Sequence, residues 1–158
     1  ARTLNFLTEH EIESYPDLES RVAEITAAST EAAAALKAAE RRLAEMAVLI
    51  KDVTTCKELH PLLQEYQWAA DKKQFRRKHE GTLILYEAAA KALKEQGFQK
   101  LPDLYALKNE YKQLAEQKKQ LQQQYAEIKR QMQEYGIIKQ NVDGILRTAP
   151  GKEQMQER

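Results

Sequence analysis

The chain is poor in glycine, proline and cysteine, and each shortage excludes a class of structure. Only 5 glycines and 4 prolines occur in 158 residues, which leaves little material for the turns of an all-β or loop-rich fold. The single cysteine, Cys56, cannot form an internal disulfide and favours a reducing compartment. The sequence also lacks both a long apolar run and a signal-peptide pattern. We therefore expect a cytoplasmic protein with no membrane partner.

The residues that are abundant are helix formers. Alanine, leucine, glutamate, lysine, glutamine and arginine dominate the chain. The formal net charge is only +1, from 25 basic and 24 acidic residues, so the chain is not a polycation. The balance is uneven, because residues 51–100 hold 10 basic and 7 acidic side chains while residues 1–50 hold 5 and 9. The composition predicts an all-α fold whose middle third is its basic part.

Residues 104–146 carry a repeat of mostly apolar side chains at alternating spacings of three and four. The positions are Leu104, Leu107, Tyr111, Leu114, Lys118, Leu121, Tyr125, Ile128, Met132, Tyr135, Lys139, Val142 and Leu146. A seven-residue repeat of this kind produces an apolar stripe along one side of a helix, and such helices pack against a partner helix. We interpret Lys118 and Lys139 as residues that fix the register of that pairing.

A second stripe of the same period lies near the start of the chain. Its positions are Tyr15, Leu18, Val22, Ile25, Ser29, Ala32, Leu36, Ala39, Leu43, Met46, Ile50 and Val53. Two stripes of equal period, joined by a helical connection, predict an antiparallel pair. The expected fold is an elongated antiparallel helical bundle or coiled coil, with two long outer helices and shorter central helices.

Local signals set the expected boundaries. We expect a helical bundle over residues 8–146, with helices at about 9–52, 57–70, 71–96 and 103–146. Thr8 followed by Glu11 predicts a capping box at the first helix, and Pro16 predicts either a kink or a restart there. Asp71 followed by Gln74 predicts another cap, and Gly97 a helix end. Residues 1–7 are expected to end a preceding segment, and residues 147–158 to form a disordered tail.

Chemically reactive groups are few. Cys56 and His60 are four residues apart and would share one helix face, but two ligands without a third leave an ordinary thiol as the competing interpretation. His79 lies on an apolar stripe, which favours a packed side chain over a general base, and His10 is expected to be solvated. No phosphate-binding glycine loop occurs. We therefore predict no catalytic residue, no metal, no cofactor and no small-molecule substrate.

One cluster of charge could have a function. The candidate nucleic-acid-binding residues are Lys72, Lys73, Arg76, Arg77, Lys78 and Lys91. At 100° per residue in one helix, Lys73, Arg77 and Lys91 would point away from the stripe that contains Phe75. Such a ridge could bind phosphates, since lysine and arginine release counterions from nucleic acid. The alternative is a solvated face paired with Glu80 or Glu87 at helical spacing.

Several strings, taken in order, resemble the helical C-terminal region of relaxase (mobilization nuclease) proteins of conjugative transposons. They are TEHEI at 8–12, LKAAERRLA at 36–44, FRRKHE at 75–80, EAAAKA at 87–92, KLP at 100–102, LKNEY at 107–111 and NVDGIL at 141–146. In that family, an N-terminal nuclease domain nicks DNA with a tyrosine and a histidine cluster that binds metal. No such cluster occurs here, so no catalytic residue is carried over.

The resemblance implies a relaxase fragment that lacks its nuclease. We therefore expect a non-enzymatic accessory module for conjugative mobilization, an arm that contacts DNA or a protein of the transfer machinery. The alternative is a structural coiled-coil module, which forms a homodimer or docks a protein partner and has no role with nucleic acid.

Overall fold

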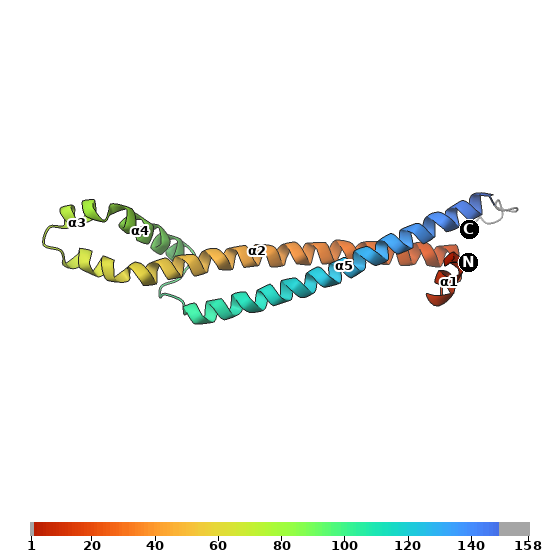
Figure 1. Ribbon diagram of the computed structural model, residues 1–158, viewed down its shortest axis with the longest axis horizontal. Helices are drawn as coiled ribbons and strands as arrows, with labels where there is room; N and C mark the ends of the chain where they lie inside the picture. The colour runs from red at the N-terminus through yellow and green to blue at the C-terminus, as the bar shows by residue number, and fades with distance from the viewer. Residues whose placement is uncertain (1, 149–158) are drawn as a thin grey trace. The chain divides into compact units, whose positions relative to one another are not determined.

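The computed structural model describes residues 2–148, which are mostly helical and contain no strand. The predicted all-α fold is therefore confirmed for this part of the chain. The helices, labelled in Figure 1, are α1 (Arg2–Glu9), α2 (Tyr15–Trp68), α3 (Lys72–Lys78), α4 (Glu80–Glu95) and α5 (Leu104–Thr148). Most of the predicted tail, residues 149–158, lies outside the described residues.

The chain divides into two compact units, and each has its own core. Unit 1 comprises residues 1–37 and 119–158, and unit 2 comprises residues 38–118. The buried core of unit 1 is formed by Phe6, Ile12, Leu18, Tyr135 and Ile138. In this unit the start of α2 is bonded near the end of α5, through Tyr15 and Asp143. Ile25, later in α2, lines the same cavity as Tyr135, earlier in α5, so the two segments run antiparallel there.

The core of unit 2 joins α2, α4 and the start of α5. Its buried members are Met46, Leu49, Val53, Cys56, Ala89, Leu93 and Leu107. After α2 ends, α3 and α4 fold back alongside its C-terminal part (Figure 1). An ion pair between Arg42 and Glu110, at 3.2 Å, joins α2 to α5 in the same unit.

Both predicted apolar stripes are covered. Every position of the stripe from Tyr15 to Val53 is buried or half-buried. In the stripe on α5, Leu121 and Ile128 are half-buried, and the most exposed members are Tyr111 at 37% and Met132 at 39%. Because the neighbouring positions on α5 are mostly exposed, the three-four spacing identified the packed face of this helix.

The predicted start of the first long helix is wrong. Thr8 lies within α1, where its hydroxyl donates to the Leu4 carbonyl at 2.9 Å instead of capping a helix. Glu11 has a φ of 55° in the turn that separates α1 from α2. The long helix begins six residues later than expected, where the Ser14 hydroxyl accepts the Asp17 N–H at 3.2 Å. Pro16 therefore lies in the first turn, where the missing N–H has no helical partner to lose.

The predicted division into separate helices at about 9–52 and 57–70 is also wrong, because α2 continues to Trp68. The helical stripe extends through this region: Val53 is fully buried and Cys56 is 6% exposed. Thr54 fits the helix by donating its hydroxyl to the Ile50 carbonyl at 2.7 Å. Packing of this face therefore outweighs the weak helix propensity of the paired threonines. Pro61 consequently lies inside α2 and not in the first turn of a new helix.

The predicted helix at 71–96 is present as two helices. Its start is confirmed, since the Asp71 carboxylate accepts the Gln74 N–H at 3.1 Å. However, His79 has a φ of −123° and separates α3 from α4. At the far end, Gly97 has a φ of 91°, and its N–H donates to the Lys94 carbonyl at 2.9 Å. The Phe98 N–H donates to the Leu93 carbonyl at 3.1 Å, which completes a Schellman cap.

Candidate nucleic-acid interface

The seven-residue helix α3 carries most of the predicted binding residues. Lys72, Lys73, Arg77 and Lys78 are exposed, and none forms an ion pair with any residue that the structure describes. The helix dipole favours the cations at the C-terminal end of α3 but not Lys72 and Lys73 in its first turn. Arg76, Arg77 and Lys78 occupy its last turn, where cations interact favourably with the negative end of the helix dipole.

Arg76 differs from the other cations of α3. Its Nη2 donates to Glu87 Oε1 on α4 at 2.7 Å, and its Nη1 donates to Oε2 at 3.4 Å. This two-point contact raises the pKa of Arg76 above its usual value, with a smaller contribution from Tyr66. The same contact lowers the pKa of Glu87. The predicted pairing of the basic run with Glu87 is therefore found for one cation, across the helix break and not within one helix.

Aromatic rings lie under α3. Phe75 is half-buried and stacks on Tyr66 of α2, with ring centroids 5.8 Å apart. His79 also packs on Phe75, with ring centroids 4.5 Å apart, which agrees with its predicted role as a packed side chain. Trp68, by contrast, is 86% exposed at the end of α2. The contact between Phe75 and Tyr66 positions the basic helix, and it covers the ring faces that meet.

The prediction that Lys73, Arg77 and Lys91 point away from the Phe75 stripe of one helix loses its premise, because these residues lie on two helices. It assumed one helix with a constant rotation of 100° per residue, whereas the backbone leaves the helical conformation at His79. Lys91 lies on α4, where it is exposed and has no ion-pair partner among the described residues. Lys91 therefore lies on a different helix from the other five candidate residues, which are all on α3.

A pocket opens elsewhere in unit 2, between α2, the end of α4 and the segment that follows it. Its volume is about 480 Å³. The lining residues are Cys56, Lys57, His60, Tyr86, Ala90, Leu93, Phe98, Gln99, Lys100 and Leu101. Burial raises the pKa of the Cys56 thiol, and the nearby Asp52 carboxylate adds to this increase. Cys56 and His60 do share one side of α2, but no group of three potential ligands for a metal occurs in residues 2–148.

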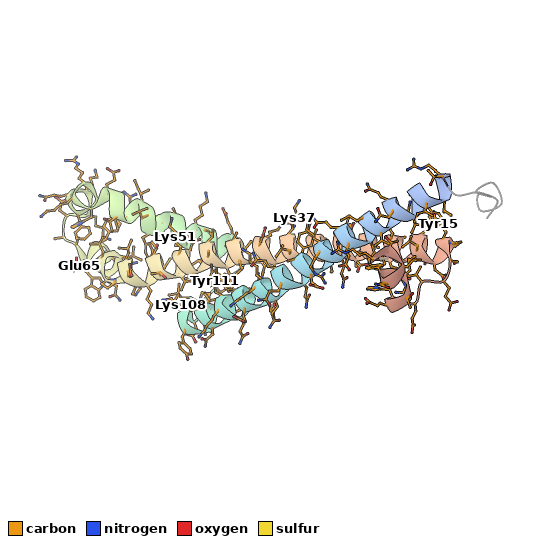
Figure 2. The ribbon with its side chains drawn as sticks, turned by 45° about the vertical axis from the view of Figure 1, so that its right-hand side comes forward. Tyr15, Lys37, Lys51, Glu65, Lys108 and Tyr111 are labelled. Atoms are coloured by element: carbon orange, nitrogen blue, oxygen red, sulfur yellow. The ribbon has the colours of Figure 1, made fainter. Side chains whose placement is uncertain are left out.

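Unit 1 contains a polar cluster that links the start of α2 to the end of α5. The Tyr15 hydroxyl donates to Asp143 Oδ1 at 2.5 Å, and Lys139 Nζ pairs with Oδ2 at 3.2 Å (Tyr15 is labelled in Figure 2). His10 is not solvated as predicted. Its Nδ1 lies 2.9 Å from the Phe6 carbonyl, and its ring stacks on Phe6 at 4.0 Å.

Sequence reasoning found the basic cluster but missed the pocket. Phe98 and Leu101 lie in a short polar-looking stretch that carries no periodicity, so they received no role. The combination of Gly97 and Pro102, which predicts a tight reversal between two helices, was the available signal for a residue cluster there. The contact between Arg76 and Glu87 was less apparent from the sequence, because the two residues are eleven positions apart and lie on different helices.

No family model, no curated protein and no solved structure matches this chain. None of the helices in residues 2–148 has the length and apolarity that crossing a lipid bilayer requires.

Proposed function

We propose that this chain is a non-catalytic helical module that binds DNA through the basic helix α3. The observation that carries the proposal is a set of four exposed cations on one seven-residue helix that have no ion-pair partner among the described residues. They are Lys72, Lys73, Arg77 and Lys78. In view of the sequence resemblance described above, the module serves a relaxase in conjugative mobilization, in the cytoplasm. The nuclease activity then belongs to another part of the parent protein.

Electrostatics makes phosphates the natural target of this helix. Each lysine or arginine that neutralises a phosphate releases condensed counterions, which supplies most of the affinity of sequence-independent binding. Stacking of bases on the protein requires free aromatic faces, and the face of Phe75 toward α2 is already stacked on Tyr66. We therefore expect binding that depends strongly on salt and weakly on sequence.

The experiment measures binding of single- and double-stranded DNA at low and moderate salt. Replacing Lys73→Glu and Arg77→Glu together should abolish salt-dependent binding, since both cations project from α3. The matched control is Lys108→Glu with Lys112→Glu, because these exposed lysines on α5 have the same spacing of four residues. Binding by the wild type that is unaffected by the α3 variant, or affected equally by the control, refutes the DNA proposal.

The proposal includes a mechanical role for the long helices. We infer that α2 and α5 pair antiparallel as an elongated coiled coil, which would make the module a stiff arm. Coverage of both heptad stripes supports this, as does the antiparallel contact within unit 1. Sedimentation velocity tests the inference, because a compact particle of the same mass would sediment faster than an extended one.

A second candidate function rests on a different surface. On α4, Ile84 is 51% exposed and Leu85 is 62% exposed, and these two apolar side chains are a surface that a protein partner could cover. The corresponding function is structural, namely dimerisation or docking of a transfer-machinery protein. Light scattering over a range of concentrations separates the two, since a dimer that dissociates after Ile84→Lys and Leu85→Lys would favour the structural role.

A further inference from the structure

We infer that the pocket of unit 2 binds a small apolar anion, such as an aromatic or aliphatic carboxylate or sulfonate. The pocket lies apart from the basic helix α3, and this site goes beyond the proposed DNA-binding function. Its volume of about 480 Å³ falls in the range of pockets that hold small organic molecules. All its lining residues belong to residues 38–118, so one unit forms the whole site.

The apolar part of the pocket has an exposed mouth and a buried floor. Phe98 is 37% exposed and Leu101 is 47% exposed, although both are large apolar residues in the segment between α4 and α5. Below them, Leu93 is 5% exposed and belongs to the core of the unit. A ligand that covered Phe98 and Leu101 would remove this apolar surface from water, which is the main favourable contribution to binding by such a pocket.

The segment that carries the mouth is anchored at its start. The positive φ of Gly97 turns the chain sharply out of α4, and the Phe98 N–H is held by the Leu93 carbonyl at 3.1 Å. Phe98 is therefore fixed beside the end of α4 before any ligand binds. Because this side of the pocket is already formed, ligand binding costs less conformational entropy.

The charges at the pocket determine the class of ligand. Lys57, His60 and Lys100 line it, all three are exposed, and no aspartate or glutamate is among the lining residues. Neither lysine forms an ion pair with a described residue, so both ammonium groups are available to an anion. An apolar body with one negative group matches the combination of apolar lining residues and two lysine ammonium groups. The Asp52 carboxylate lies near Cys56 but is not among the lining residues, whereas both lysines are.

Cys56 provides a reporter for occupancy. It lines the pocket, is the single cysteine of the chain, and is 6% exposed. Since burial and Asp52 raise the pKa of its thiol, it is protonated and unreactive at neutral pH, and it has no chemical role in the proposal. Any thiol modification of the whole protein must occur at this pocket.

The first experiment compares two fluorescent probes of nearly equal size, 1-anilinonaphthalene-8-sulfonate and its neutral relative N-phenyl-1-naphthylamine. We expect the sulfonate to bind the wild type more tightly. Lys57→Glu with Lys100→Glu should weaken binding of the sulfonate about tenfold and leave the neutral probe nearly unchanged. Lys108→Glu with Lys112→Glu is the matched control and should change neither. Equal affinity of the wild type for both probes, or equal loss in the control, overturns the assignment of an anion.

The second experiment locates the bound probe. Leu101→Glu should weaken binding of both probes, whereas Tyr105→Glu should not, because Tyr105 is 73% exposed outside the pocket. In the wild type, alkylation of Cys56 by iodoacetamide at alkaline pH should slow about tenfold when the free sulfonate is at ten times its dissociation constant, since about one site in eleven is then empty. An unchanged alkylation rate at that concentration overturns the proposal without any variant.

Discussion

At the scale of single residues, three polar side chains join the two parts of unit 1. Tyr15 comes from the start of α2, and Lys139 and Asp143 come from near the end of α5. Asp143 accepts the Tyr15 hydroxyl and pairs with Lys139, and these two contacts lower its pKa. The Tyr15 contact with Asp143 raises the pKa of the tyrosine, and the pKa of Lys139 is raised through its bonds with Tyr15 and Asp143. Each of the three groups is therefore held in the ionisation state that it has at neutral pH.

These shifts predict a loss of stability in acid. Because folding lowers the pKa of Asp143, its contribution is fully present above the unfolded value of 3.8 and is lost as the pH falls through the lower, folded value. Asp143→Asn should reduce the free energy of unfolding by about 1 kcal/mol at pH 7, discounted because the side chain is partly exposed, and by less at pH 3.

Urea unfolding of both proteins at the two pH values measures this difference. Tyr15→Phe should reproduce most of the loss at pH 7, while Tyr105→Phe, at an exposed tyrosine, should be neutral. A loss for Asp143→Asn that is equal at both pH values would contradict the assignment.

The contact of Arg76 with Glu87 predicts a variant that binds DNA more tightly. Glu87→Gln removes the carboxylate that holds the guanidinium of Arg76, and therefore releases a fifth cation on α3. The slope of log affinity against log salt should become steeper by about 0.9, the value for one additional phosphate contact.

The control for this prediction is Glu80→Gln. It removes the same charge from the first turn of α4, but Glu80 holds no arginine among the described residues. If Glu80→Gln strengthens DNA binding as much as Glu87→Gln does, the effect is one of net charge and not of Arg76.

At the scale of the helices, both backbone conformation and packing determine where a helix ends. Gly97 ends α4 with a positive φ, and no atom lies within 4 Å of the position that a Cβ would take there. Gly81, inside α4, also has open space around it but a helical conformation. Because neither position is crowded, substitutions at the two glycines differ only in backbone conformation.

Alanine substitutions at these glycines should have opposite effects. Gly97→Ala should destabilise unit 2 by about 1 kcal/mol, because a left-handed conformation strains any residue with a Cβ. Gly81→Ala should stabilise it by about 0.5–1 kcal/mol, because alanine loses less backbone freedom in a helix. Thermal unfolding followed by circular dichroism measures both, and changes of the same sign would contradict this account of the α4 end.

At the scale of the whole molecule, the long helices α2 and α5 contribute to two separate cores. Leu18 is 1% exposed in the core of unit 1, and Met46 is 1% exposed in the core of unit 2. Truncation of a fully buried leucine or methionine to alanine costs about 2–5 kcal/mol. The affected region should be the unit that contains the lost contacts.

Hydrogen exchange can show this separation directly. Leu18→Ala should accelerate amide exchange mainly in residues 2–37 and 119–148, and Met46→Ala mainly in residues 38–118. Uniform acceleration across the chain by either substitution would mean that the two cores open together, contrary to the expectation from their separate contacts.

The sequence by itself determined the helical class of the fold and the packed faces of both long helices. It also identified the Asp71 cap, the turn at Gly97 and the cations of α3. These features follow from local physics: side-chain periodicity defines a helix face, and caps depend on neighbouring backbone groups. The sequence did not determine where α2 stops or that His79 divides α3 from α4. The burial of Val53 and Cys56 against other helices keeps α2 helical past residue 56, and such tertiary contacts are not visible in local sequence.

Only the tertiary structure decided which distant residues meet. Tyr15 reaches Asp143, Arg76 holds Glu87, and Cys56 shares a pocket with Phe98 and Leu101. No local spacing encodes these contacts, because each joins residues on different helices or in the segments between them. The physical reason is that the apolar pattern of a helix shows which face must be buried but not which residues will bury it. The arrangement of the neighbouring helices and segments determines those residues.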